Sequence, residues 1–180
     1  MKLSRFSRAA FLVAVLHTAG AAETPAPASA PAAGAAPCIA HIYHQFDFWI
    51  GNWSVTEKGK PAGSNRIDRL LDGCALLENW VGVDGSRGHS LNFYDRGRGV
   101  WQQTWIDNAA GALNLTGQFK DGHMVLSGMS IDAKTHAQRI DRITWTPNPD
   151  GTVRQLWDQS PDTGRTWKVL FDGLYAHKMP

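Results

Sequence analysis

Hydrophobic and polar residues alternate in short runs along most of this chain. Between residues 64 and 178, runs rich in β-branched and aromatic residues are separated by tight turns containing glycine, asparagine or aspartate, such as Asp84-Gly85 and Asp121-Gly122. These turns recur about every 8–14 residues, the spacing of antiparallel strands joined by hairpins. The pattern predicts an all-β domain without a long amphipathic helix.

Ten strands are predicted by this pattern. A series of hairpins leaves strand edges to protect, and closure into a barrel removes those edges completely. Residues 41–49 are expected to form a short helical turn whose Phe46, Phe48 and Trp49 plug one end. We therefore expect a single antiparallel β-barrel with a short N-terminal helical plug. The predicted strands are 51–58, 65–71, 74–81, 88–94, 99–107, 111–119, 122–130, 137–146, 151–160 and 165–176.

The alternation also predicts which side chains the barrel encloses. Several strands place tryptophan beside amide or acidic residues on one face, which indicates a partly polar interior with aromatic walls. A slip of one residue would exchange the two faces of a strand. Apolar faces are expected for Leu113, Leu115 and Phe119, and for Trp167, Val169, Phe171 and Tyr175. The expected ligand-binding residues are Glu78, Trp80, Asn92, Tyr94, Gln103, Trp105, Gln155 and Trp157.

The first 22 residues have the three parts of an export signal. Lys2, Arg5 and Arg8 precede an apolar core that is too short to span a bilayer, and small residues end the segment. Residues 23–37 are rich in alanine and proline and are expected to form an extended linker, which leaves residues 38–180 as the β-barrel domain. We expect a periplasmic or secreted bacterial protein that has no membrane anchor once the signal is cleaved.

The charge of the chain argues against a polyanionic partner. Three of its 18 lysines and arginines lie in the predicted signal, so 15 remain against 16 aspartates and glutamates. Nucleic acids and anionic membrane surfaces are bound by a surplus of positive charge, which this domain lacks. A small molecule is the expected partner.

Two cysteines, Cys38 and Cys74, follow the predicted cleavage site. In an oxidising compartment a disulfide is the expected state, and it would fasten the segment entering the barrel to the third strand. Free buried cysteines are one alternative. A metal site is another, because Cys38, His41 and His44 are spaced Cys-x2-His-x2-His, although no fourth ligand is evident.

Five sequence runs stand out after residue 38: FDFWIGNW (46–53), DGC with ENW (72–80), SLNFYD (90–95), WQQTWID (101–107) and VRQLW (153–157). These runs resemble those of an exported bacterial family of uncharacterised function. They cover nearly everything after residue 38, and the resemblance implies no activity. More distantly, Gly51-x-Trp53 after a helical turn resembles the opening of lipocalins and other calycins. Ten strands depart from the eight of lipocalins and are closer to fatty-acid-binding proteins and haem-binding nitrobindins.

The nitrobindin likeness implies haem as an alternative cofactor, with His177 in the place of the late histidine ligand. No cofactor is otherwise indicated. Residues 160–167 resemble the Asp-box hairpin of sialidases, in which Asp162 would accept turn N–H groups, Gly164 would take a positive φ and Trp167 would pack under the turn. A single such hairpin indicates a folding device and no glycosidase.

These features lead to three hypotheses on function. The first is a small-molecule binding or carrier protein that takes an apolar or aromatic ligand. The second is a cofactor-independent isomerase, cyclase or hydrolase that uses Glu78 as acid or base, with Arg142 or Arg154 as its counter-ion. The third is a structural module with a filled barrel. No nucleophile elbow, phosphate loop or dinucleotide fingerprint is present in the sequence.

Overall fold

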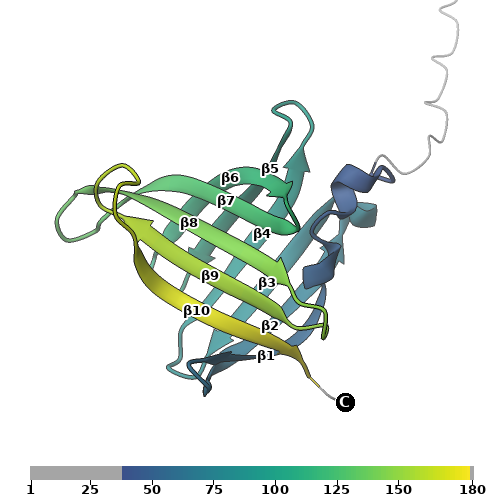
Figure 1. Ribbon diagram of the computed structural model, residues 1–180, viewed down its shortest axis with the longest axis horizontal. Helices are drawn as coiled ribbons and strands as arrows, with labels where there is room; N and C mark the ends of the chain where they lie inside the picture. Colours follow the sequence, from purple (N-terminus) through teal and green to yellow (C-terminus); the bar gives the residue numbers. More distant parts are fainter. Residues whose placement is uncertain (1–37, 179–180) are drawn as a thin grey trace, which may run out of the picture. The chain divides into compact units, whose positions relative to one another are not determined.

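The computed structural model describes residues 38–178, which form a closed antiparallel β-barrel (Figure 1). Each of its ten strands pairs with the next along the chain, and β10 returns to pair with β1. The strands are β1 (Gly51–Glu57), β2 (Lys60–Leu70), β3 (Ala75–Gly82), β4 (Arg87–Asp95), β5 (Val100–Asp107), β6 (Ala112–Lys120), β7 (His123–Ile131), β8 (Gln138–Pro147), β9 (Val153–Ser160) and β10 (Lys168–His177). Three short 3-10 helices accompany them: η1 (His41–His44), η2 (Asp47–Trp49) and η3 (Leu71–Gly73).

The barrel and its number of strands confirm the prediction from the alternating pattern. The largest difference between the predicted and the observed strands is the start of β2, which was predicted at residue 65 and lies at Lys60. The strand includes Pro61, which pairs with Thr56 beside a shift in the β1–β2 register. A proline and a glycine close together indicate a turn, but a proline beside a bulge gives up no ladder hydrogen bond. The predicted signal and linker lie outside the described residues. None of the helices within residues 38–178 has the length and apolarity needed to cross a membrane.

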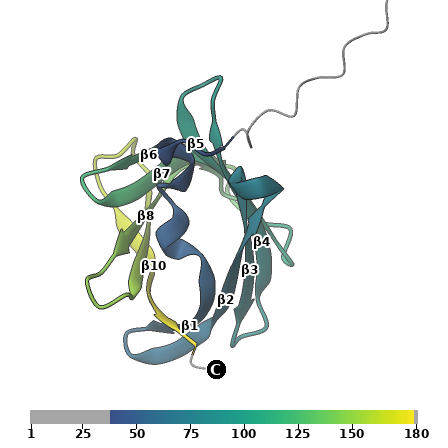
Figure 2. The same cartoon turned by 90° about the vertical axis from the view of Figure 1, so that its right-hand side faces the viewer.

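One end of the barrel is closed by the segment of residues 41–49, which carries η1 and η2 and which we call the plug (Figure 2). Phe46 and Trp49 are fully buried, and their rings stack with centroids 5.0 Å apart. Trp145 packs against both of them from β8. Trp53 is also fully buried, and its indole N–H donates to the carbonyl of Trp49 at 2.9 Å. Large aromatic side chains therefore fill this end, as the sequence predicted.

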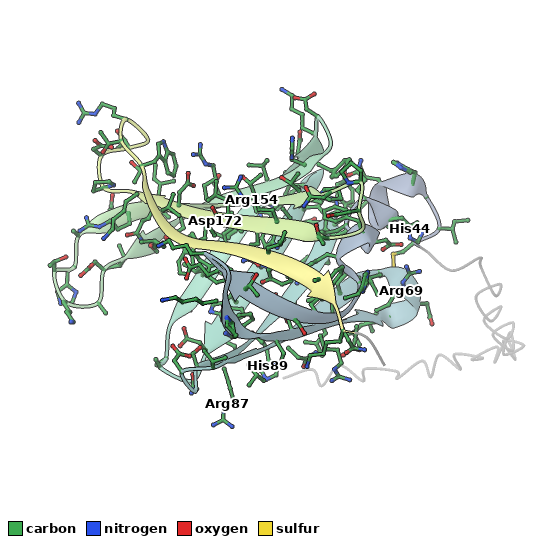
Figure 3. All side chains as sticks on the ribbon, turned by 60° about the horizontal axis from the view of Figure 1, so that its bottom comes forward. His44, Arg69, Arg87, His89, Arg154 and Asp172 are labelled. Carbon is green, nitrogen blue, oxygen red and sulfur yellow. A yellow bond between two sulfur atoms is a disulfide. The ribbon has the colours of Figure 1, made fainter. Side chains whose placement is uncertain are left out.

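The plug is fastened to the barrel at several points. A disulfide joins Cys38 to Cys74 just before β3, as predicted. The Asp47 carboxylate accepts from Arg69 on β2 at 2.6 Å and lies 2.9 Å from the Nδ1 atom of His44 (Figure 3). A covalent bond and an ion pair therefore hold the plug in place.

The last strand departs from simple alternation. The β9–β10 register shifts between Val169 and Phe171, so Phe171 and Tyr175 face the interior while Val169 is 53% exposed. Trp167 also lies off the inner face, where the Arg142 guanidinium lies 3.8 Å from its ring centroid. The expected single face from Trp167 to Tyr175 is therefore wrong, because a bulge changes the phase of the pattern.

The hairpin before β10 has the contacts predicted for an Asp-box. The backbone N–H and the hydroxyl of Thr166 both donate to the Asp162 carboxylate, at 2.8 and 2.7 Å. Gly164 has φ of +91°, and its carbonyl accepts from the Trp167 indole at 3.0 Å. The turn is therefore held by its own side chains.

Candidate functional site

The end of the barrel opposite the plug opens into a cavity of about 630 Å³. Alternate residues of the strands supply its walls, and the hairpins that join the strands surround its mouth. This volume is within the usual range for small-molecule sites in proteins. Its lining includes Glu78, Trp80, Gln103, Trp105, Leu113, Ile143, Gln155, Trp157, Phe171 and Tyr175.

Three tryptophans and a phenylalanine line the part of the cavity nearer its mouth. We call these four side chains the aromatic wall: Trp80, Trp105, Trp157 and Phe171. All four side chains are half-buried. The Trp157 indole N–H donates to the buried Asp141 carboxylate at 2.8 Å, and the Trp80 indole N–H donates to the Ser86 hydroxyl at 3.3 Å. These hydrogen bonds fix the two rings and leave their faces for stacking.

Below the aromatic wall lies a connected set of polar side chains, the floor cluster: Asn65, Glu78, Ser90, Asn92 and Gln103. The Glu78 carboxylate accepts from the Asn65 amide at 2.7 Å and from the Ser90 hydroxyl at 2.6 Å. Behind Ser90, Asn92 donates to the Ser90 oxygen at 2.8 Å, and Gln103 donates to the Asn92 carbonyl at 2.8 Å. The network therefore holds the carboxylate in one orientation.

Burial raises the pKa of Glu78 from 4.5 to about 7, although its hydrogen bonds from Ser90 and Asn65 act to lower it. The side chain is only 4% exposed, and desolvation disfavours its charged form. A carboxyl with a pKa near 7 exchanges its proton readily at neutral pH, as acid/base catalysis requires. Glu78 is therefore the side chain of this cavity best suited to proton transfer.

Neither of the two arginines expected as counter-ions pairs with Glu78. Arg142 lies outside the barrel and binds Asp158 through two hydrogen bonds, at 3.0 and 2.6 Å. Arg154 binds Asp172 in the same way on the outer face of β9 and β10 (Figure 3). Both arginines alternate with inward-facing residues of their strands and so point away from the cavity. The prediction of an ion pair for Glu78 is therefore wrong.

Next to the floor cluster, the hydroxyl of Tyr175 donates to the Gln155 side-chain carbonyl. Burial raises the pKa of Tyr175 well above its ordinary value, and the nearby Glu78 charge raises it further. Tyr175 is 1% exposed and lines the cavity. The sequence analysis placed Tyr175 on an apolar face and did not predict it as a cavity residue. Its position two residues after Gly173, on the same inward face, could have indicated that it lines the cavity.

Six of the eight predicted ligand-binding residues line the cavity, and two do not. Asn92 is fully buried behind Ser90. Tyr94 lies at the plugged end, where its ring packs edge-on against Tyr43 with centroids 5.6 Å apart, and it borders a separate cavity of about 190 Å³. Both residues are on the inward face of β4, but they lie too far along the strand towards the plug.

Charged residues at the mouth were not predicted from the sequence. Three acidic and three basic residues from the hairpins border the opening, so their charges balance. The carboxylates of Asp84 and Asp107 are occupied by backbone N–H groups of their own turns. The charged mouth residues are Glu57, Lys58, Lys60, Asp84, Arg87 and Asp107.

The residues of the two metal alternatives lie away from this cavity. The disulfide takes up the Cys38 thiolate that a Cys38, His41 and His44 site would need, and no three potential metal-ligating side chains gather within residues 38–178. His177 is exposed at the plugged end and stacks on Trp53 with ring centroids 3.9 Å apart. It therefore does not face the cavity in which a haem would have to sit.

No protein-family model matches this chain, and a search of curated proteins finds no match.

Proposed function

We propose that this protein binds a small molecule with an apolar or aromatic body in the open end of its barrel. The observation that carries the proposal is the cavity of about 630 Å³, with aromatic side chains around its upper part and a few fixed polar groups at its base. This combination is typical of ligand sites in small barrels. A filled structural barrel, the third hypothesis, is disfavoured because the interior is hollow on this side.

Export to the periplasm or beyond is part of this proposal. The disulfide between Cys38 and Cys74 supports it, because such bonds persist in oxidising compartments and are rare in the cytosol. A likeness to exported bacterial proteins and to calycins belongs to the proposal as well. A carrier or scavenger of small molecules outside the cytoplasm would suit such a location.

Binding can be tested with N-phenyl-1-naphthylamine, an uncharged aromatic dye whose fluorescence rises in apolar surroundings. We expect saturable fluorescence with one site for each chain. A Leu113→Trp variant, which fills the cavity between its walls, should weaken binding at least tenfold. Leu91→Trp on the outer face of β4 is the matched control and should bind as the wild type does. Equal binding by all three proteins would show that the dye does not use the cavity.

Native mass spectrometry of the protein purified from the periplasm of its own host is the complementary experiment. A co-purifying mass that is lost from the Leu113→Trp variant would identify the natural ligand.

Acid/base catalysis by Glu78 is the second candidate, and the pKa of about 7 favours it. The Glu78→Gln variant distinguishes the two once the ligand is known. An enzyme would lose turnover and keep binding a neutral substrate, whereas a carrier has no turnover to lose.

A further inference from the structure

The base of the cavity offers more hydrogen-bond acceptors than the protein itself fills. The Glu78 carboxylate accepts two hydrogen bonds, whereas an ionised carboxylate has about four acceptor sites. Behind Glu78, outside the cavity lining, the buried carbonyl oxygen of Asn65 has no hydrogen-bond partner within residues 38–178 either. The only proton of the Tyr175 hydroxyl is donated to Gln155. A ligand group that reaches this depth gains most by bringing donors.

The same region lacks a positive charge. The groups that face Glu78 from the neighbouring strands are Asn65 on β2 and Ser90 on β4, and Tyr175 approaches from β10. No lysine, arginine or histidine forms an ion pair with Glu78 among the described side chains. The charged residues that share the cavity are the three acids and three bases at its mouth. An unpaired buried carboxylate is costly, and a cation supplied by the ligand would remove that cost.

We propose that the ligand carries a primary ammonium group, which binds the Glu78 carboxylate at the base of the cavity. This inference rests on the proposed binding function. The apolar body of the ligand then lies between the rings of the aromatic wall, where indole faces also attract a cation on its way to the base.

The chemistry of the site disfavours the other end groups. An ammonium brings three donors and no acceptor, which matches a base rich in acceptors. A hydroxyl brings one donor and no charge. A carboxylate or phosphate would place a second negative charge beside Glu78, and the balanced charges of the mouth give no compensating attraction.

Three probes that share an apolar phenyl-terminated chain and differ in their end group test the proposal: 4-phenylbutylamine, 4-phenylbutan-1-ol and 4-phenylbutanoate. Each is titrated into the wild-type protein by calorimetry at pH 8. We expect the amine to bind at least tenfold more tightly than the alcohol, and the carboxylate most weakly. The affinity for the amine should fall about tenfold for each pH unit below 7, because Glu78 then takes up a proton while the amine stays charged. The affinity for the alcohol should stay constant.

Glu78→Gln keeps the size of the side chain and removes its charge. It should abolish the preference for the amine over the alcohol and the pH dependence of amine binding. Asp121→Asn, in an exposed turn at the plugged end, changes the net charge equally and should behave as the wild type. Equal affinities of the amine and the alcohol, or a preference for the amine that survives Glu78→Gln, would overturn the inference. If dye binding persists in that case, the proposed binding function stands and only the ligand class is wrong; if neither dye nor probes bind, both fail.

Discussion

Replacing Glu78 with glutamine is expected to change how the stability of the barrel depends on pH. In the folded protein the pKa of Glu78 is about 7, against 4.5 as its ordinary value. Between these two values the folded state holds a proton that the unfolded state has released. Stability therefore falls as the pH rises through this window, and the contribution present below pH 4.5 is lost above pH 7.

The size of this effect follows from the two pKa values. Each pH unit between them is worth about 1.4 kcal/mol, which gives about 3 kcal/mol for the whole window. Most of this, about 2–3 kcal/mol, should be lost between pH 5 and pH 8 by the same linkage relation. Glutamine cannot ionise, so the variant lacks this loss. Altered hydrogen bonds to Asn65 and Ser90 add an offset that does not depend on pH.

The assay is urea unfolding followed by tryptophan fluorescence, at pH 5, 6, 7 and 8, with the disulfide intact in both proteins. The difference between the free energies of unfolding of variant and wild type should shift by about 2–3 kcal/mol in favour of the variant from pH 5 to pH 8. Other titrating groups are common to both proteins and cancel. Asp121→Asn should run parallel to the wild type. Parallel profiles for Glu78→Gln and the wild type would mean that Glu78 is ionised in the fold with an ordinary pKa, and the reasoning would be refuted.

Three further predictions concern the stability of the barrel. Replacing both cysteines with serine removes a cross-link between positions 36 residues apart and should lower the free energy of unfolding by about 4 kcal/mol in urea titrations; an unchanged midpoint would contradict this. Gly117→Ala places a methyl group against the carbonyl oxygen of Val125 and should cost more than about 2 kcal/mol in the same assay, whereas Gly97→Ala in an exposed turn should cost less than about 1 kcal/mol. Asp162→Ala should speed amide hydrogen exchange at Thr166 without changing exchange in β3, and equal protection in both proteins would show that the carboxylate does not hold the hairpin.

The sequence predicted the architecture well, because two-residue alternation and turn chemistry are local signals. It also predicted the inward faces of β3, β5 and β9, including Glu78, Gln103 and Gln155. Neighbouring residues of a strand point to opposite faces. Because Gln155 was expected to point inward, the same pattern predicts that Arg154 points outward.

Depth along the barrel could not be predicted, because it depends on the register between strands. Tyr94 pairs with Trp101 near the plug, while Gly88 on the same strand pairs with Asp107 at the mouth. The charged mouth residues were missed for a related reason: closure brings together hairpins that are far apart in sequence. The bulge before Phe171 was also invisible, since no glycine or proline marks it.

Both ends of the described chain leave the barrel on the same side. Cys38 is bonded to Cys74 there, and the backbone N–H of Lys178 donates to the carbonyl of Asn52 at 2.9 Å. Anything attached directly before Cys38 or directly after Lys178, such as an affinity handle, a reporter domain or a surface linker, would therefore start at the end of the barrel opposite the entrance used by a guest molecule. Immobilised protein should consequently retain full access for solutes, which makes the scaffold suitable for capture or sensing formats.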